Sequence, residues 1–231
     1  MSGESDSAAA APHADLTLDE IRAALGPRIA AEAAFDGWSN RALEQAAALA
    51  GVPASVARLA FPGGAMDMIE AWIGAIDARM EAAFAGGELD TLPVRDRIRT
   101  LVQFRLDAVA GEKEALRRAL AIMALPQNVA RTWRIGWRSA DAMWRLAGDR
   151  ATDYNHYTKR MLLGAIYSAT LAVFADDESD GQHDTRAFLD RRIEDVMRIG
   201  KATGRLSRQR EGFDVVRFLG RLRYPDRART H

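Results

Sequence analysis

The sequence of 231 residues contains no cysteine, which excludes disulfides, thiolate metal sites and cysteine nucleophiles. Its histidines number four, at positions 13, 156, 183 and 231, and no Glu-x-x-His pair of the di-iron bundle type is present. Glycine-rich phosphate loops, Gly-x-Ser-x-Gly and His-Glu-x-x-His are also missing. We therefore expect no metal, no cofactor and no catalysis by this chain.

Long hydrophobic runs are absent as well. The longest segment without a charged residue, 161–175, has fifteen residues. As a helix it would extend roughly 22 Å, which is shorter than the ~30 Å hydrocarbon core of a bilayer. Residues 1–16 contain acidic residues but no arginine, unlike a secretory signal or a transit peptide. We expect this segment to be a disordered tail.

The net charge is zero, but the charges are unevenly distributed along the chain. Residues 1–90 contain five basic and fourteen acidic residues, whereas residues 198–231 contain ten basic and three acidic residues. Such an asymmetry bears on which partners the protein meets, because it determines which surfaces attract anions.

Signals for β-strands are missing, and nearly every segment has helical periodicity. Thr17 and Glu20 form a capping-box pattern, Ser39 is a second N-cap, and Gly51 followed by Pro53 separates two further helices. We predict an all-α fold of about ten helices, the last two over 184–201 and 209–223, with a solvated loop at 176–181. The expected organisation is a helix-turn-helix-like three-helix unit (17–62), a larger C-terminal bundle (63–203) and a basic amphipathic helix and tail (204–231).

The helix-turn-helix pattern raises the question of DNA binding. Its second helix, ASVARLAF, contains Arg58 as its one charged residue, and the surrounding N-terminal segment is acidic. A DNA reader needs cations beside the phosphates and polar side chains on its recognition helix. The pattern therefore favours a unit kept for packing, and we expect no nucleic acid as a partner.

Tryptophans are concentrated before the apolar segment. Trp133, Trp137 and Trp144 are spaced four and seven residues apart, so they share one helix face. This face forms either ordinary bundle core or one wall of a cavity for an apolar ligand. On the second interpretation, the predicted lipid-binding residues are Trp133, Trp137, Met143, Trp144, Met161, Leu162, Ile166 and Leu171.

The C-terminal segment has an amphipathic pattern. Its apolar residues recur at i, i+3, i+4 and i+7, with arginines on the other side of the helix. This face either binds an anionic membrane surface or docks on the bundle or a partner subunit. The predicted membrane-binding residues are Val215, Phe218, Leu219 and Leu222, together with Arg217 and Arg221.

Several segments together resemble the ubiquinone-biosynthesis accessory protein family, the ninth of the coenzyme Q biosynthesis set. They include FDGWSNRALEQAAALAG, AFPGGAMDMIEAW, EKEALRRALAIMALPQN and GDRATDYNHYTKRMLLGAIYSATL, within residues 25–203. The resemblance implies the fold of TetR-type regulators, binding of isoprenoid quinone or phospholipid, a homodimer, and a C-terminal helix at membranes. It also implies a partner, demethoxyubiquinone hydroxylase or an equivalent ring hydroxylase, and a cytoplasmic location, peripheral on a bacterial inner membrane, or on the matrix side in a mitochondrion.

The partner-facing patch of that family corresponds to DYNHYTKR, residues 153–160. Its usual aromatic pair falls on His156 and Tyr157, and the first of the two is usually tryptophan. The resemblance thus suggests Asp153, Asn155, His156, Tyr157 and Lys159 as partner-binding residues. The alternative function is a TetR-type DNA-binding transcriptional regulator with a small hydrophobic inducer.

Overall fold

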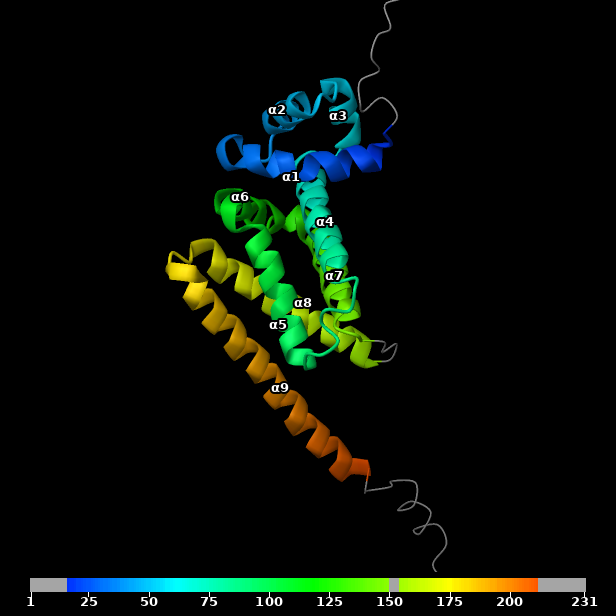
Figure 1. Cartoon of the computed structure of the whole chain (residues 1–231), viewed down its shortest axis with the longest axis vertical. Helices are drawn as coiled ribbons and strands as arrows, with labels where there is room; N and C mark the ends of the chain where they lie inside the picture. Colours follow the sequence, from blue (N-terminus) through cyan, green and yellow to red (C-terminus); the bar gives the residue numbers. More distant parts are fainter. Residues whose placement is uncertain (1–15, 150–153, 212–231) are drawn as a thin grey trace, which may run out of the picture. The chain divides into compact units, whose positions relative to one another are not determined.

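The computed structural model describes residues 16–149 and 154–211, and all secondary structure in these residues is helical (Figure 1). The predicted all-α class is therefore confirmed. The α-helices are α1 Leu18–Asp36, α2 Asn40–Ala50, α3 Ala54–Ala60, α4 Ala65–Ala83, α5 Val94–Ala108, α6 Lys113–Met123, α7 Val129–Leu146, α8 Tyr154–Asp176 and α9 His183–Glu211. Short 3₁₀ turns lie at Ala110–Glu112, Pro126–Asn128 and Asp180–Gln182.

The helices α1 to α3 have the boundaries that their capping residues predict. The backbone N–H of Glu20 donates to Thr17 Oγ1 at 3.3 Å, and the Thr17 N–H donates to Glu20 Oε2 at 2.8 Å, which completes the capping box. Ser39 Oγ accepts from the N–H of Ala42, and Gly51 ends α2 in the left-handed conformation at φ 72°. The three helices form the head (Figure 1).

Helix α4 begins in the head and continues into the bundle (Figure 1). It packs against α1 at Gly26, where a Cβ would lie only 2.7 Å from the carbonyl carbon of Ala71. A second junction is formed by Trp38, whose indole lies 5.3 Å from that of Trp72 and donates to the carbonyl of Ala115 in α6 at 3.0 Å. The head is thus joined to α4 and α6 by close backbone packing and a buried hydrogen bond.

The helices α4 to α8 form the bundle. Helix α7 packs against α8 and against α4, and α5 packs against α4, α7 and α8. Buried apolar side chains from each helix fill the interior, among them Met80, Leu101, Leu106, Met143, Leu163 and Phe174. Residues up to Leu189 form one compact unit, and Asp190 begins a second.

The predicted helix end at Lys201 is wrong, because α9 continues without interruption to Glu211. Gly200 and Gly204 lie within the helix, where a glycine costs only about 1 kcal/mol relative to alanine. The predicted membrane-binding residues lie beyond this point, outside the described residues. Within the described part of the chain, no helix combines the length and apolar character needed to cross a bilayer.

Candidate functional site

Helices α7 and α8 bear a group of large apolar side chains, four exposed and one half-buried, which we term the aromatic surface: Trp133, Trp137, Tyr157, Met161 and Leu162. The rings of Trp133 and Trp137 lie 6.5 Å apart, and those of Trp137 and Tyr157 lie 5.8 Å apart. Trp133 is 58% exposed and Tyr157 is 59% exposed, and Met161 and Leu162 are also exposed. Large exposed apolar side chains grouped on a surface mark binding sites for proteins, membranes or ligands.

The other predicted lipid-binding residues lie in different environments. Met143 is fully buried in the bundle core, whereas Ile166 and Leu171 are half-buried on α8. Trp144 is half-buried, and its Nε1 donates to the carbonyl of Lys159 at 2.9 Å. The eight residues therefore extend from solvent to the core instead of lining a single wall.

The predicted partner-binding residues lie at the start of α8, with one exception. Asp153 lies outside the described residues, and Asn155 and His156 belong to the first turn of the helix. Lys159 Nζ pairs with Asp149 Oδ1 at 2.7 Å and lies 5.5 Å from the centre of the Trp144 ring. The Lys159 ammonium is therefore held against the end of α7, while Tyr157 remains open to solvent as part of the aromatic surface.

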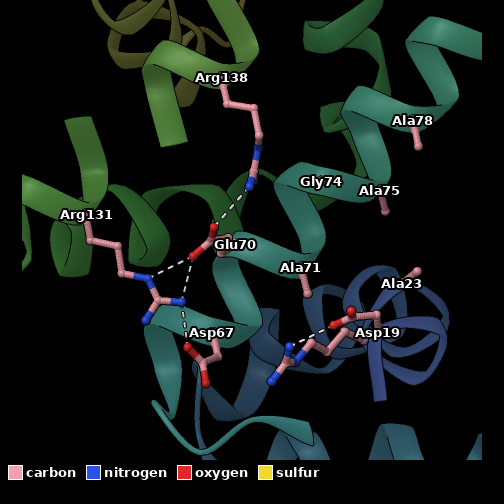
Figure 2. Close-up of a pocket in the computed structure, with 11 residues that line it drawn as sticks. Asp19, Ala23, Asp67, Glu70, Ala71, Gly74, Ala75, Ala78, Arg131 and Arg138 are labelled. Atoms are coloured by element: carbon pink, nitrogen blue, oxygen red, sulfur yellow. Dashed lines mark hydrogen bonds and ion pairs between the residues drawn. The ribbon is translucent and has the colours of Figure 1, made fainter. Parts of the chain in front are cut away.

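A groove of about 410 Å³ opens between α1, α4 and α7 (Figure 2). None of the predicted site residues lines it. Small residues of α4 form much of its lining, and charged side chains surround them. The lining residues are Asp19, Arg22, Ala23, Asp67, Glu70, Ala71, Gly74, Ala75, Ala78, Arg131 and Arg138.

One side of the groove is formed by ion pairs between α4 and α7 (Figure 2). Arg131 donates to Asp67 Oδ1 at 2.5 Å and to Glu70 Oε2 at 2.7 Å, and Arg138 donates to Glu70 Oε1 at 3.0 Å. Partial burial works against the charge of Glu70, but Arg131 and Arg138 outweigh it and lower the pKa of this carboxyl below its ordinary value.

This row of charges continues into the bundle core. Arg138 Nε lies 4.0 Å from Asp77 Oδ2, and Asp77 is the buried partner of the Arg105 guanidinium. Ser139 links the two, because it accepts from Arg105 Nη2 at 3.2 Å and donates to Asp77 Oδ2 at 3.0 Å. The ring of Tyr167 lies 4.9 Å from Arg105 Cζ. We call Arg105, Asp77, Ser139 and Tyr167 the buried polar cluster.

The buried polar cluster contains a charge that is almost inaccessible to water, since Arg105 is 1% exposed. Burial works against that charge, but the interactions with Tyr167 and Asp77 outweigh it and raise the pKa of the guanidinium above its ordinary value. Arg105 Nε is also buried and has no hydrogen-bond partner among the described residues. Such a donor is exceptional in a folded protein and calls for an explanation.

Sequence reasoning did not identify this cluster. A usable signal was present, since Asp77 falls on the apolar face of α4 and Arg105 on the apolar face of α5. Each residue taken alone is typical of a solvent-facing position, because lone charged residues are rarely buried. Their partnership arises from packing between helices that are distant in the sequence.

The fold indicates the structural class of the protein. The structure is similar to the crystal structure of the TetR transcriptional regulator from Nitrosomonas europaea ATCC 19718, with a TM-score of 0.60 and 25% identity. The match covers 76% of this chain and 97% of that one. The chain therefore has a TetR-like fold.

The sequence comparisons identify similar proteins. Residues 129–200 match the COQ9 family model. The chain is 31% identical over 171 residues to the ubiquinone biosynthesis protein COQ9, mitochondrial, of Rattus norvegicus, and 29% identical to that of Homo sapiens, over 71% of this chain in each case. The chain spans about half the length of these relatives, since the matches cover 54% of each. Over these residues the chain is similar to the COQ9 proteins of the ubiquinone biosynthesis pathway.

Proposed function

We propose that this protein is a non-catalytic accessory protein of ubiquinone biosynthesis, which binds a polyprenylated quinone precursor and presents it to a ring hydroxylase at the membrane. The observation that carries the proposal is the position of the aromatic surface. Its five side chains all lie within residues 129–200, the segment that matches the COQ9 family. The names of the relatives supply the pathway.

The lipid part of the proposal rests on physical need. A polyprenylated ring is too apolar to leave a bilayer unaided, so a carrier must offer apolar surface in place of the acyl chains. Trp133, Met161 and Leu162 supply such surface on the outside, and Met143 and Phe174 supply it in the core. The bound ligand would be an isoprenoid quinone, its precursor or a phospholipid.

The partner part of the proposal rests on Tyr157 and its surroundings. A large exposed ring backed by Trp137 is the kind of rigid anchor that dominates protein interfaces. We propose that the start of α8, including His156 and Lys159, contacts the hydroxylase and that the chemistry belongs to that partner. The protein would act as a homodimer, and its C-terminal residues would contact the cytoplasmic face of a bacterial inner membrane or its matrix equivalent.

Solvent extraction of the purified protein, followed by mass spectrometry, tests the lipid proposal. We expect prenylated quinones, their precursors or phospholipids in the extract, and uptake of an added quinone analogue in native mass spectrometry. A bare protein that takes up no analogue would contradict lipid binding. Trp133→Ser should lower the uptake severalfold, whereas Leu59→Ser, which changes an exposed apolar residue of α3, should not.

A second candidate function is favoured by the fold of the Nitrosomonas europaea protein, which is named as a TetR transcriptional regulator. The charges of the head weigh against it. Arg58, the one cation of α3, pairs with Glu44 Oε1 at 2.7 Å, and acidic residues outnumber basic ones in the first 90 positions. A phosphate backbone would be repelled by such a surface. A gel-shift assay at low salt separates the two functions, since a regulator would retard DNA and an accessory protein would not.

A further inference from the structure

We propose that Arg105 is the polar anchor of the ligand-binding interior, where its Nε–H donates a hydrogen bond to an uncharged oxygen on the ring of a bound prenylated molecule. This inference rests on the proposed lipid-binding function and deepens it. The starting observation is the buried Nε that has no partner among the described residues. The other two guanidinium nitrogens of Arg105 are already engaged, by Asp77 and by Ser139.

The two existing bonds hold the guanidinium in place. Asp77 and Ser139 come from α4 and α7, and they are themselves linked by a hydrogen bond of 3.0 Å. The Arg105 Cζ lies over the ring of Tyr167 of α8, 4.9 Å from its centre. A donor fixed from three helices costs little further ordering when an acceptor arrives, which is the condition for selective binding.

The charges around Arg105 indicate which acceptor fits. The linked row contains three arginines and three acids: Arg105, Arg131, Arg138, Asp67, Glu70 and Asp77. The row is therefore neutral as a whole, and Asp77 already balances the buried guanidinium. A second anion would be buried without a counter-charge, which is strongly unfavourable. An uncharged carbonyl, hydroxyl or ether oxygen satisfies the donor without adding charge.

Two glycines lie on the helices that bear both the buried polar cluster and the aromatic surface. Gly136 on α7 and Gly164 on α8 are half-buried, and a Cβ added to either would meet no atom within 4 Å. On α7, residues spaced one turn apart form a row of Trp133, Gly136 and Ser139. A second row with the same spacing, on α8, consists of Met161, Gly164 and Tyr167. Rows of this spacing wind across a helix. In each row, the glycine lies between an exposed side chain and a member of the cluster.

A ligand with an apolar tail and an oxygen-bearing ring matches this arrangement. The tail would contact the aromatic surface and the space beside the two glycines, and the ring oxygen would reach Arg105. The cluster would thus select the head of the ligand, while the apolar side chains hold its tail. A hydrocarbon tail alone would leave the Nε–H unsatisfied, so it should bind more weakly than the ring-bearing molecule.

The test compares three probes on the full-length protein by native mass spectrometry and tryptophan fluorescence. The probes are a short-chain prenylated benzoquinone, an isoprenoid hydrocarbon of equal chain length, and the corresponding prenyl monophosphate. We expect the wild-type protein to bind the quinone at least about tenfold more tightly than either of the others, because tenfold corresponds to one good hydrogen bond. Equal binding of quinone and hydrocarbon, or tighter binding of the phosphate, would overturn the inference while leaving lipid binding intact.

The variant Arg105→Lys keeps the positive charge opposite Asp77 but removes the Nε–H. It should retain hydrocarbon binding and lose the preference for the quinone, whereas the control Arg134→Lys, at an exposed position of α7, should keep the preference. An Arg105→Lys protein that folds and still prefers the quinone contradicts the inference. If this variant does not fold, the preference of the wild-type protein decides. Failure of all three probes to bind would instead contradict the proposed function itself.

Discussion

At the scale of single residues, Asp177 shows how one carboxylate organises a connection between helices. It lies just after α8, and its oxygens accept from the backbone N–H and hydroxyl of Ser179 and from those of Thr185 in α9. These donors stabilise the ionised form and lower the pKa of Asp177 far below its ordinary value, although burial opposes the shift. The side chain is nearly inaccessible to solvent, with 7% of its residue surface exposed.

This arrangement predicts a contribution to stability that depends on pH. Because the folded-state pKa is depressed, the contribution is complete well above the ordinary value of 3.8 and is lost as the pH falls below it. We expect Asp177→Asn to lower the free energy of unfolding by about 2 kcal/mol at pH 7, and by progressively less below about pH 4. Urea unfolding between pH 3 and 7 measures this difference, with the buffers spanning roughly the range of carboxyl titration.

The neighbouring Asp176 provides the control. Its side chain is 85% exposed and lies 3.6 Å from Arg117. Asp176→Asn should change the unfolding free energy by no more than about 0.5 kcal/mol at any pH, because exposed ion pairs contribute little. If both variants lower the free energy of unfolding by the same amount, Asp177 is not the organising group.

The sequence did not distinguish these two aspartates. Both lie in a run of acidic residues at 176–181, which is typical of a solvated loop. The difference arises when the chain turns and brings Thr185 back to residue 177, and hydrophobic periodicity does not report such a return. Side chain–backbone bonds across a turn are recognisable from sequence mainly at helix starts, where the spacing is fixed.

At the scale of helices, the features that the sequence predicted well are those with short-range causes. Thr17, Ser39 and Gly51 cap helices through atoms three or four residues away, so their roles follow from local geometry. The ion pairs between α4 and α7 join residues more than sixty positions apart, such as Arg131 and Glu70. Their pairing depends on how the bundle packs, so the sequence did not predict the groove or which residues pair within the buried polar cluster.

The crossing of α1 and α4 gives a prediction at this scale. Gly26→Ala places a methyl group 2.7 Å from the backbone of Ala71, where no flexible side chain can move away. We expect a loss of roughly 1–3 kcal/mol, as for overpacked cores, even though alanine is the better helix former. Thermal or urea unfolding measures the loss.

Gly136→Ala is the matched control for that variant. It lies inside α7, and its added Cβ meets no atom within 4 Å. Helix propensity then acts alone, and the protein should gain about 0.5–1 kcal/mol. A Gly26→Ala protein that is also stabilised would contradict the prediction, because it would show that α1 and α4 can move apart without a cost in stability.

At the scale of the whole molecule, the acidic first 90 residues and the basic C-terminal segment indicate different partners for the two ends of the chain. The basic segment also contains the apolar residues Phe218 and Leu219. Together these features support the proposal that the C-terminal end contacts an anionic bilayer, while the bundle and its aromatic surface receive the ligand.

This proposal predicts the behaviour of a double variant. Phe218→Ser with Leu219→Ser removes two side chains that would each contribute about 1.5–3 kcal/mol on full burial. Co-sedimentation with vesicles containing anionic lipid should fall by more than about tenfold, and added salt should weaken the binding of the wild-type protein. Unchanged co-sedimentation would show that another part of the chain contacts the bilayer.

The placement of the tryptophans has a consequence for how this protein can be observed. Trp38 and Trp72 are shielded at the junction of the head and the bundle, whereas the indole of Trp133 faces water. A soluble quencher such as iodide should therefore extinguish the emission of Trp133 first and leave the two shielded indoles bright. Trp133 is thus an intrinsic fluorescent reporter on the aromatic surface, where the ligand or partner is proposed to bind. Binding there can be followed without a label.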